Sequence, residues 1–350
     1  MLRRKLLKGL SISAAALPFV SARAVLAQAS GDPYLAYVDP ELRPLAAQIL
    51  PLFINQSPPS LARLQQDRIA VEKFGGAGPR SDVPYEKLVI PGAKGAPAVT
   101  VYVVNAGKPG ARPALLHTHG GGYTAGSAFG ALSGVQTMCR DLDCVGVTVE
   151  YRLAPETTYR GSIEDNYAGL KWLHDNAESL GVDPARIAVI GESAGGGHAA
   201  LLAIAARDRG EVPVAFQCLI YPMLDDRTGT TRKVPAHVGR VMWTPMSNRF
   251  GWQCFLGRTP GLASGPTGGV PARVQNLAGL PPTFIGVGAL DLFVDEDVDY
   301  SQRLNASGVP TELVVVPRAF HGFDGQKSTN IAARFYAAKL AALKSGLGVA

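Results

Sequence analysis

A serine lies at the centre of the run Gly191-Glu192-Ser193-Ala194-Gly195. The residues before it, 187–190, are apolar and partly β-branched, which predicts a buried strand, and residues 198–209 are rich in Ala and Leu, which predicts a helix. A serine at a sharp turn from strand to helix has strained backbone angles that hold its hydroxyl clear of the sheet, where it can act as a nucleophile. The five-residue pattern alone equally fits a glycine-rich turn that only begins a helix.

An acid and a base follow this serine along the chain. Asp291 and His321 each come after a predicted strand, where open α/β sheets carry the residues that face a ligand. His321 would take the proton of Ser193, and Asp291 would orient the imidazole and stabilise its charged form. Asp295 is the alternative acid, although it also fits the carboxylates that stabilise helix N-termini.

A glycine-rich loop is predicted to stabilise the negative charge that forms on the substrate. It directly follows a predicted strand that ends at Thr118, and glycine lets the backbone approach a substrate without a Cβ in the way. We assign the oxyanion hole to the amides of Gly120, Gly121 and Ala194. The residues predicted to support the site without touching the reacting atoms are His119, Gly122 and Glu192.

Strands and helices alternate through most of the chain. Strands are predicted at 85–90, 99–104, 114–118, 145–149, 187–190, 214–221, 283–288 and 313–316, and helices at 132–141, 163–180, 198–209, 294–306 and 331–343. Asp183-Pro184 is predicted as a turn into a strand. This order indicates an α/β protein with a mostly parallel eight-stranded sheet, two antiparallel strands at its start and helices on both faces.

Two stretches do not follow the alternation. Residues 30–75 contain several prolines among short helical patches, and residues 225–280 contain Trp243, Trp252 and Phe255 without a strand signal. A structureless loop of that length inside a compact domain is improbable. We therefore interpret both stretches as parts of a helical cap, the second of them inserted into a domain spanning residues 76–350.

The N-terminus resembles an export signal. Residues 1–29 hold five basic residues and no acidic one, with a paired Arg3-Arg4 typical of twin-arginine signals, an apolar run and an A-x-A-type cleavage site at Ala27-Gln28-Ala29. An uncleaved membrane anchor is the alternative, but the apolar run is short for a spanning helix. Cleavage would lower the formal net charge of the 350-residue chain from +6 to +1. We expect a periplasmic or secreted protein without nucleic-acid partners or stable membrane association.

The four cysteines give no sign of a metal site. None forms a C-x-x-C pair, so a zinc site is not expected, and the predicted chemistry requires neither metal nor cofactor. An oxidising compartment would permit a disulfide, but no pairing is assigned.

Taken together, the motifs resemble those of the bacterial hormone-sensitive-lipase-like (family IV) esterases of the α/β-hydrolase superfamily. The resembling segments are His119 to Tyr123, Tyr151 to Glu156, Gly191 to Gly196, Gly288 to Glu296 and His321 to Phe323. The resemblance implies an α/β-hydrolase fold, carboxylic-ester hydrolysis, and a cap made from the N-terminal segment and an insertion after the sixth strand. One departure is Asp291-Leu292-Phe293, where the family often has Asp-Pro-Leu.

The sequence therefore predicts a serine carboxylesterase that acts on small-molecule esters with short acyl chains. The segment from Tyr151 to Glu156 is interpreted as structural, holding its loop beside the catalytic face. Two alternatives stay open: a serine amidase or peptidase with the same three residues, and a non-catalytic binding protein on a hydrolase fold.

Overall fold

A single eight-stranded sheet forms the centre of the computed structural model, which describes residues 31–74 and 78–349. The strands are β1 (Tyr85–Ile90), β2 (Val99–Val104), β3 (Arg112–Thr118), β4 (Val145–Glu150), β5 (Val182–Glu192), β6 (Phe216–Ile220), β7 (Thr283–Gly288) and β8 (Thr311–Val316), in the spatial order β1-β2-β4-β3-β5-β6-β7-β8. β2 is antiparallel to both of its neighbours, and the other pairs are parallel. The predicted mostly parallel eight-stranded sheet is confirmed. The predicted export signal lies outside the described residues.

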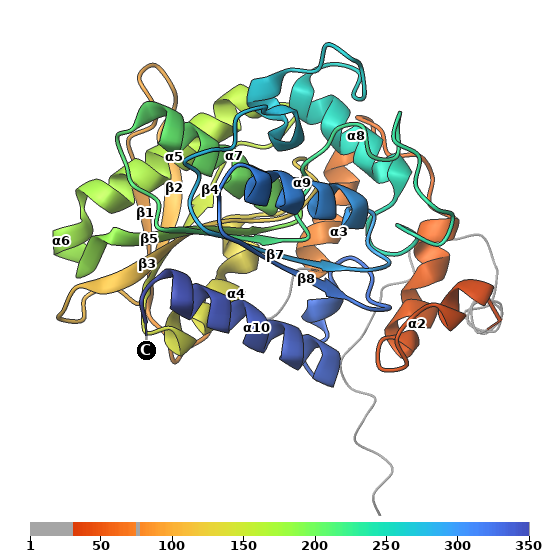
Figure 1. The fold of residues 1–350 in the computed structure, drawn as a ribbon, viewed down its shortest axis with the longest axis horizontal. Helices are drawn as coiled ribbons and strands as arrows, with labels where there is room; N and C mark the ends of the chain where they lie inside the picture. Colours follow the sequence, from red (N-terminus) through yellow and green to blue (C-terminus); the bar gives the residue numbers. More distant parts are fainter. Residues whose placement is uncertain (1–30, 75–77, 350) are drawn as a thin grey trace, which may run out of the picture.

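Helices cover both faces of the sheet (Figure 1). One face carries α4 (Ala128–Asp141) and α10 (Asn330–Gly346), and the other carries α5 (Tyr159–Asp175), α6 (Ala177–Leu180), α7 (Ala194–Arg209) and α9 (Val294–Ala306). Central strands such as β3 are buried along their whole length, because both faces are covered. Two large apolar cores result, one on each side of the sheet.

Several element boundaries differ from the sequence-based expectation, and three of the differences change how a segment is interpreted. β5 begins at Val182, so Asp183-Pro184 lies within the strand rather than in a turn before it. The helix expected over 163–180 is two helices, separated at Asn176, whose side-chain amide donates to the Trp172 carbonyl at 2.8 Å. α7 starts four residues before His198, directly after the serine.

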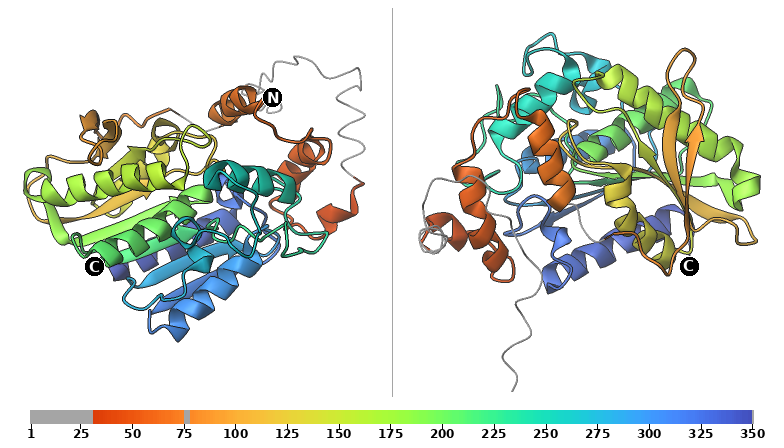
Figure 2. Two further views of the ribbon diagram at one scale, coloured as in Figure 1. Left: turned by 90° about the horizontal axis from the view of Figure 1, so that it is seen from above. Right: turned by 180° about the vertical axis from the view of Figure 1, so that it is seen from behind.

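The two stretches interpreted as a cap are helical in part. Residues 33–74 contain η1 (Pro33–Ala36), α2 (Arg43–Ile54) and α3 (Leu64–Phe74), and the insertion contains α8 (Pro245–Leu256), η2 (Thr267–Gly269) and η3 (Pro271–Arg273). The N-terminal stretch and α8 lie at the end of the sheet towards which the parallel strands run (Figures 1 and 2). The last part of the insertion runs back over α7 and α9, where Arg207 and Arg303 donate to the carbonyls of Asn276 and Ala272. Within the described ranges, no helix combines the length and hydropathy needed to cross a bilayer.

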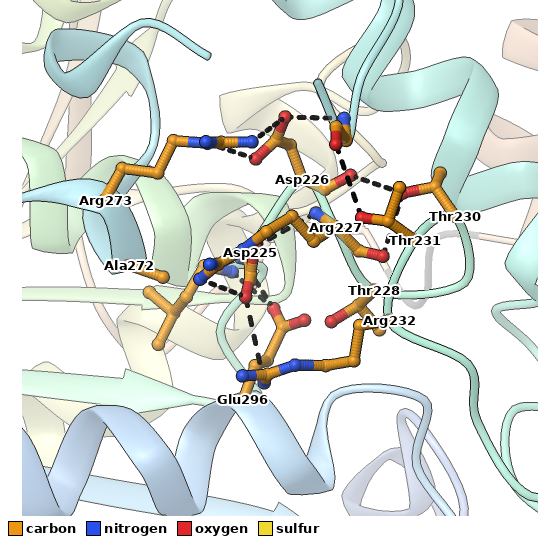
Figure 3. A network of polar contacts seen from close by, with 12 residues as sticks. Asp225, Asp226, Arg227, Thr228, Thr230, Thr231, Arg232, Ala272, Arg273 and Glu296 are labelled. Carbon is orange, nitrogen blue, oxygen red and sulfur yellow. Dashed lines mark hydrogen bonds and ion pairs between the residues drawn. The ribbon is translucent and has the colours of Figure 1, made fainter. Parts of the chain in front are cut away.

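A network of ion pairs and hydrogen bonds anchors the first residues of the 225–280 insertion (Figure 3). Asp225 and Asp226, which follow β6 after residues 221–224, are buried. Asp225 pairs with Arg227, and Asp226 accepts two hydrogen bonds from Arg273 at 2.6 and 3.0 Å. Glu296 of α9 accepts the backbone N–H groups of Leu224 and Asp225 at 2.6 and 3.1 Å. The insertion is thus tied to the helix that follows the loop carrying Asp291.

Candidate active site

Ser193 occupies the turn between β5 and α7, at φ 59° and ψ −124°. Such a left-handed conformation is costly for a non-glycine residue and persists only where surrounding contacts enforce it. Here the Ser193 N–H donates to the Ile220 carbonyl at 2.9 Å, and the Ser193 carbonyl accepts the Met223 N–H at 3.0 Å. A Cβ at Gly195 would overlap the Thr118 carbonyl oxygen, so the first turn of α7 can pass β3 only with glycine at that position.

A continuous chain of hydrogen bonds joins the three residues proposed for catalysis. The Nε2 atom of His321 lies 2.9 Å from Oγ of Ser193, and its Nδ1 atom lies 2.8 Å from Oδ2 of Asp291. Asp291 is fully buried, and its other carboxylate oxygen accepts the Phe293 N–H at 3.0 Å. The alternative acid, Asp295, is exposed in the first turn of α9. The structure therefore brings together Ser193, Asp291 and His321.

Aromatic rings fix the orientation of the His321 imidazole. Tyr221 meets its ring edge-on with centroids 4.6 Å apart, and Phe293 does so at 5.3 Å. Tyr221 in turn donates its hydroxyl to Asp324 at 2.8 Å. Sequence reasoning did not single out Tyr221, although its position directly after β6 is a strand-end signal of the same kind as that of Asp291.

The glycine loop folds over the nucleophile. A Cβ built at Gly120 would lie 3.5 Å from Cβ of Ser193, so the loop backbone passes directly beside the reactive side chain. The Gly121 carbonyl accepts the N–H groups of Thr124 and Ala125 at 3.2 and 3.0 Å, which closes the loop into a tight turn. Gly121 and Gly122 have φ values of 126° and 60°, which glycine adopts without steric cost.

His119 anchors this loop from the protein interior. Its Nδ1–H donates to the Gly120 carbonyl at 2.8 Å, its ring stacks on Tyr151 at 4.1 Å, and the Tyr151 hydroxyl donates to the His119 carbonyl at 2.6 Å. Burial lowers the pKa of His119 to about 4, so the imidazole is neutral at pH 7. Tyr151 belongs to the segment interpreted as structural, and through this bond the segment holds the loop.

Glu156, at the end of the segment from Tyr151 to Glu156, binds the N-terminal helix α3. Glu156 accepts two hydrogen bonds from Arg68 of α3, both at 2.7 Å, and Arg68 also donates to the Thr124 carbonyl at 2.7 Å. A bidentate Arg–carboxylate pair fixes geometry as well as distance. Helix α3 is thereby fastened to the turn that contains the glycine loop.

Glu192 lies next to the nucleophile in the chain but pairs with a residue of β3. Its Oε2 atom lies 2.9 Å from Nε2 of His117, whose Nδ1 atom lies 2.8 Å from the Thr148 hydroxyl oxygen. Burial alone would raise the pKa of the Glu192 carboxyl, but His117 and Lys339 outweigh it and hold the pKa below its usual value. The contact of His117 with Glu192 depends on the register of β3 and β5, which the sequence alone does not reveal.

A second buried histidine lies behind the loop. His198 of α7 is enclosed by the rings of Tyr123, Tyr151 and Phe255, at centroid distances of 5.1, 4.4 and 5.2 Å. Neither ring nitrogen has a hydrogen-bond partner among the described residues. Burial, with a smaller contribution from His119, lowers the pKa of His198 to about 3. Within the described ranges, no group of three or more His, Cys, Asp or Glu side chains could hold a metal ion.

Comparisons with known proteins identify the fold family of this chain. A family model described as the alpha/beta hydrolase fold matches residues 115–325. Esterase LipI of Mycobacterium tuberculosis is 36% identical over 220 residues, which cover 61% of this chain and 66% of that protein. Carboxylesterase NlhH of the same organism is 36% identical over 217 residues, covering 60% and 66%. The match thus spans just under two thirds of the length of these curated relatives.

Solved structures match over more of the chain. A bacterial heroin esterase has a TM-score of 0.80 and 35% identity, and the match covers 89% of this chain and 99% of that protein. The esterase LipW from Mycobacterium marinum has a TM-score of 0.73 and 32% identity, covering 89% and 96%.

Proposed function

This chain belongs to the α/β-hydrolase fold family, in the branch of the hormone-sensitive-lipase-like esterases, and from that premise we propose that it hydrolyses carboxylic esters with Ser193 as the nucleophile. The observation that carries the proposal is the bonded chain from Ser193 through His321 to the buried Asp291, at a strained strand-to-helix turn. The names of the relatives, esterase and carboxylesterase, support the choice of ester over amide as the substrate.

The geometry is suited to a two-step reaction. Oγ of Ser193 attacks the ester carbonyl carbon while Nε2 of His321 takes the hydroxyl proton, and Asp291 stabilises the resulting imidazolium. The protonated His321 then gives that proton to the departing alcohol, which leaves an acyl group on Ser193. A water molecule, deprotonated by His321, attacks the acyl carbonyl, and the acid is released as Ser193 regains its proton.

Backbone amides would stabilise the charge that forms in both steps. The candidates are those of Gly120, Gly121 and Ala194, because the glycine loop and the first residue of α7 flank the Ser193 hydroxyl. One well-placed donor of this kind is typically worth about 10²–10³ in rate. His119 and Gly122 shape the loop, and Glu192 braces the turn before the serine through His117.

A pair of variants tests the proposal. Ser193→Ala is expected to lower kcat by about 10⁶, and adding His321→Ala should cost little more, because the residues act in one step. Additive losses would contradict that shared step. Covalent labelling of Ser193 by a fluorophosphonate, compared between wild type and Ser193→Ala, tests the non-catalytic alternative. Matched p-nitrophenyl ester and p-nitroanilide substrates separate an esterase from an amidase or peptidase.

We extend the proposal to substrate size: acyl chains of about two to eight carbons are preferred. A closed pocket gains about 0.8 kcal/mol per buried methylene and gains nothing once the chain outgrows it. The N-terminal segment nevertheless exposes Leu52, Ile54 and Leu61, a feature that the sequence did not indicate and that favours contact with a lipid surface. Rates on p-nitrophenyl acetate, butyrate, octanoate and palmitate, with and without micelles, distinguish a preference for short acyl chains from activity at a lipid surface. A jump in rate at the micelle threshold would identify a lipase.

We also propose that the protein is exported and cleaved near Ser30. The basis is the basic, then apolar, then A-x-A pattern of residues 1–29. The intact mass of the periplasmic or secreted protein tests this. A mass that retains those residues would contradict cleavage and favour an anchor.

A further inference from the structure

A short segment of the insertion, residues 237–243, lies against the loops that carry Asp291 and His321 and against the glycine loop; we call it the strap. The Gly239 N–H donates to the Leu290 carbonyl at 3.0 Å, directly before Asp291. Met242 Cε lies 3.6 Å from the position of a Cβ at Gly322, directly after His321. The strap therefore contacts the loop of Asp291 through Gly239 and lies beside the loop of His321 at Met242.

The far end of the strap reaches the glycine loop. A Cβ at Gly122 would overlap Cη2 of Trp243, so the outer edge of the indole rests on the glycine itself. At its other edge, Nε1 of Trp243 donates to Oδ1 of Asn248 at 3.0 Å, and the buried Asn248 amide donates to the Thr228 carbonyl at 2.8 Å. The indole is held at both edges, in one orientation, beside the oxyanion loop.

Met242 lies at a strained point of the strap. Its φ is 66°, and the Trp243 N–H donates to the Val241 carbonyl at 2.8 Å across it, which defines a classic γ-turn. That turn is rare and strained for a non-glycine residue, and strain of this kind is retained at functional sites. The turn buries Val241 in the core and leaves Met242 and Trp243 partly exposed on the catalytic face.

The outer side of the strap is held by the N-terminal segment. Both terminal nitrogens of Arg240 approach the Asp32 carboxylate, at 3.4 and 3.5 Å, and its guanidinium lies 5.3 Å from the centre of the Tyr34 ring. The His237 ring stacks on Tyr37 with centroids 4.9 Å apart. These contacts hold the strap from outside, while Met242 and Trp243 lie against Gly322 and Gly122 of the site loops.

We propose that the strap sets which esters fit the site, with Trp243 limiting the acyl group and Met242 limiting the alcohol group. His321 must protonate the departing alcohol, so the alcohol side of the substrate lies next to His321 and therefore next to Met242. The acyl group lies on the other side of the carbonyl, where Trp243 covers Gly122. The inference rests on the proposed ester hydrolysis.

Two substrate series separate the two roles. In p-nitrophenyl esters the alcohol is constant and the acyl chain varies; in acetate esters the acyl group is constant and the alcohol varies. For Trp243→Ala, the ratio of kcat/KM for octanoate to that for acetate should rise at least about tenfold, the scale on which a pocket senses methylenes. For Met242→Gly, which keeps the positive φ, the ratio for 1-naphthyl acetate to ethyl acetate should rise similarly.

Matched variants provide the controls. Trp172→Ala removes an indole that packs against the core beneath α5 and should change neither ratio. Trp243→Phe, which keeps a ring on Gly122, should give an intermediate acyl ratio, and Met242→Leu, of similar volume, should keep the alcohol ratio. Ratios that stay within twofold of wild type in Trp243→Ala and Met242→Gly, or that exchange between the two series, would overturn the inference. If the wild type hydrolysed no ester although the fluorophosphonate labelled Ser193, the proposed function would be overturned instead.

Discussion

The neutral imidazole of His198 predicts a specific dependence of stability on pH. In the folded protein its pKa is lowered to about 3, whereas an unfolded histidine titrates near 6.5. Between these values the unfolded chain binds a proton that the folded chain does not, so stability falls as pH falls below about 6.5. At pH 5 the cost is about 2 kcal/mol relative to pH 8, from 1.36 kcal/mol per pKa unit.

Replacing His198 with leucine should remove this contribution. The site is lined by aromatic rings and offers neither ring nitrogen a partner among the described residues, so an apolar side chain of similar volume fits it. The stability of His198→Leu relative to wild type should therefore increase by about 2 kcal/mol between pH 8 and pH 5. Urea unfolding at several pH values, followed by circular dichroism, measures this difference.

The prediction concerns the difference between proteins because other buried groups act in the opposite sense. Burial raises the pKa of Glu296 and of Asp297 well above the usual values, so the folded protein binds protons there that the unfolded chain does not, and stability rises as pH falls. Those contributions cancel in the comparison. Leu202→Ala, which removes a buried apolar side chain of the same helix α7 and no titratable group, is the control and should show a constant difference. A constant difference for His198→Leu as well would refute the reasoning.

Three further outcomes follow from the site and the network. Asp291→Asn should lower kcat by about 10⁴, whereas Asp295→Asn, at the exposed position, should lower it only a few-fold; reversed losses measured by steady-state kinetics would make Asp295 the acid. Asp226→Ala should lower the free energy of unfolding by about 3–5 kcal/mol, because it leaves the Arg273 charge, whose side chain is only 10% exposed, without a carboxylate partner; a loss below 1 kcal/mol in urea would contradict this. Gly122→Ala should lower kcat by about 10²–10³, because a methyl group there meets the indole above it and displaces the oxyanion loop, whereas an unchanged kcat would show that the loop tolerates the shift.

Local signals predicted the sheet because each strand is bounded by turn residues. The bounds of β1, β2 and β7 agree with the expectation residue for residue. The start of α7 was missed because Gly195 to Gly197 are poor helix formers; in the fold those positions are buried and crossed closely by the Thr118 and Met223 carbonyls, so packing outweighs propensity. No bounds were predicted for α8, because polar or small residues, Ser247, Asn248 and Gly251, occupy the first half of its buried face and leave only a short apolar pattern at its end.

The site likewise contains residues that the sequence pattern indicates and residues whose role depends on the fold. Ser193, Asp291 and His321 could be chosen from the sequence because each follows a strand, and parallel strands end at one edge of a sheet. The pairing of His117 with Glu192 requires the register between β3 and β5, and the place of Met242 requires the path of a loop without periodicity. Neither the His117–Glu192 pairing nor the position of Met242 can be read from the pattern of neighbouring residues in the sequence.

The contact between Arg240 and Asp32 has a consequence for substrate preference. The two residues are 208 positions apart, and neither touches the reacting atoms. Under the proposed role of the strap, substitutions in the N-terminal segment would alter how firmly the strap is held, and with it the range of esters accepted, without changing Ser193, Asp291 or His321. Exchanging residues 32–37 between related enzymes should therefore shift the preference among esters without changing an active-site residue.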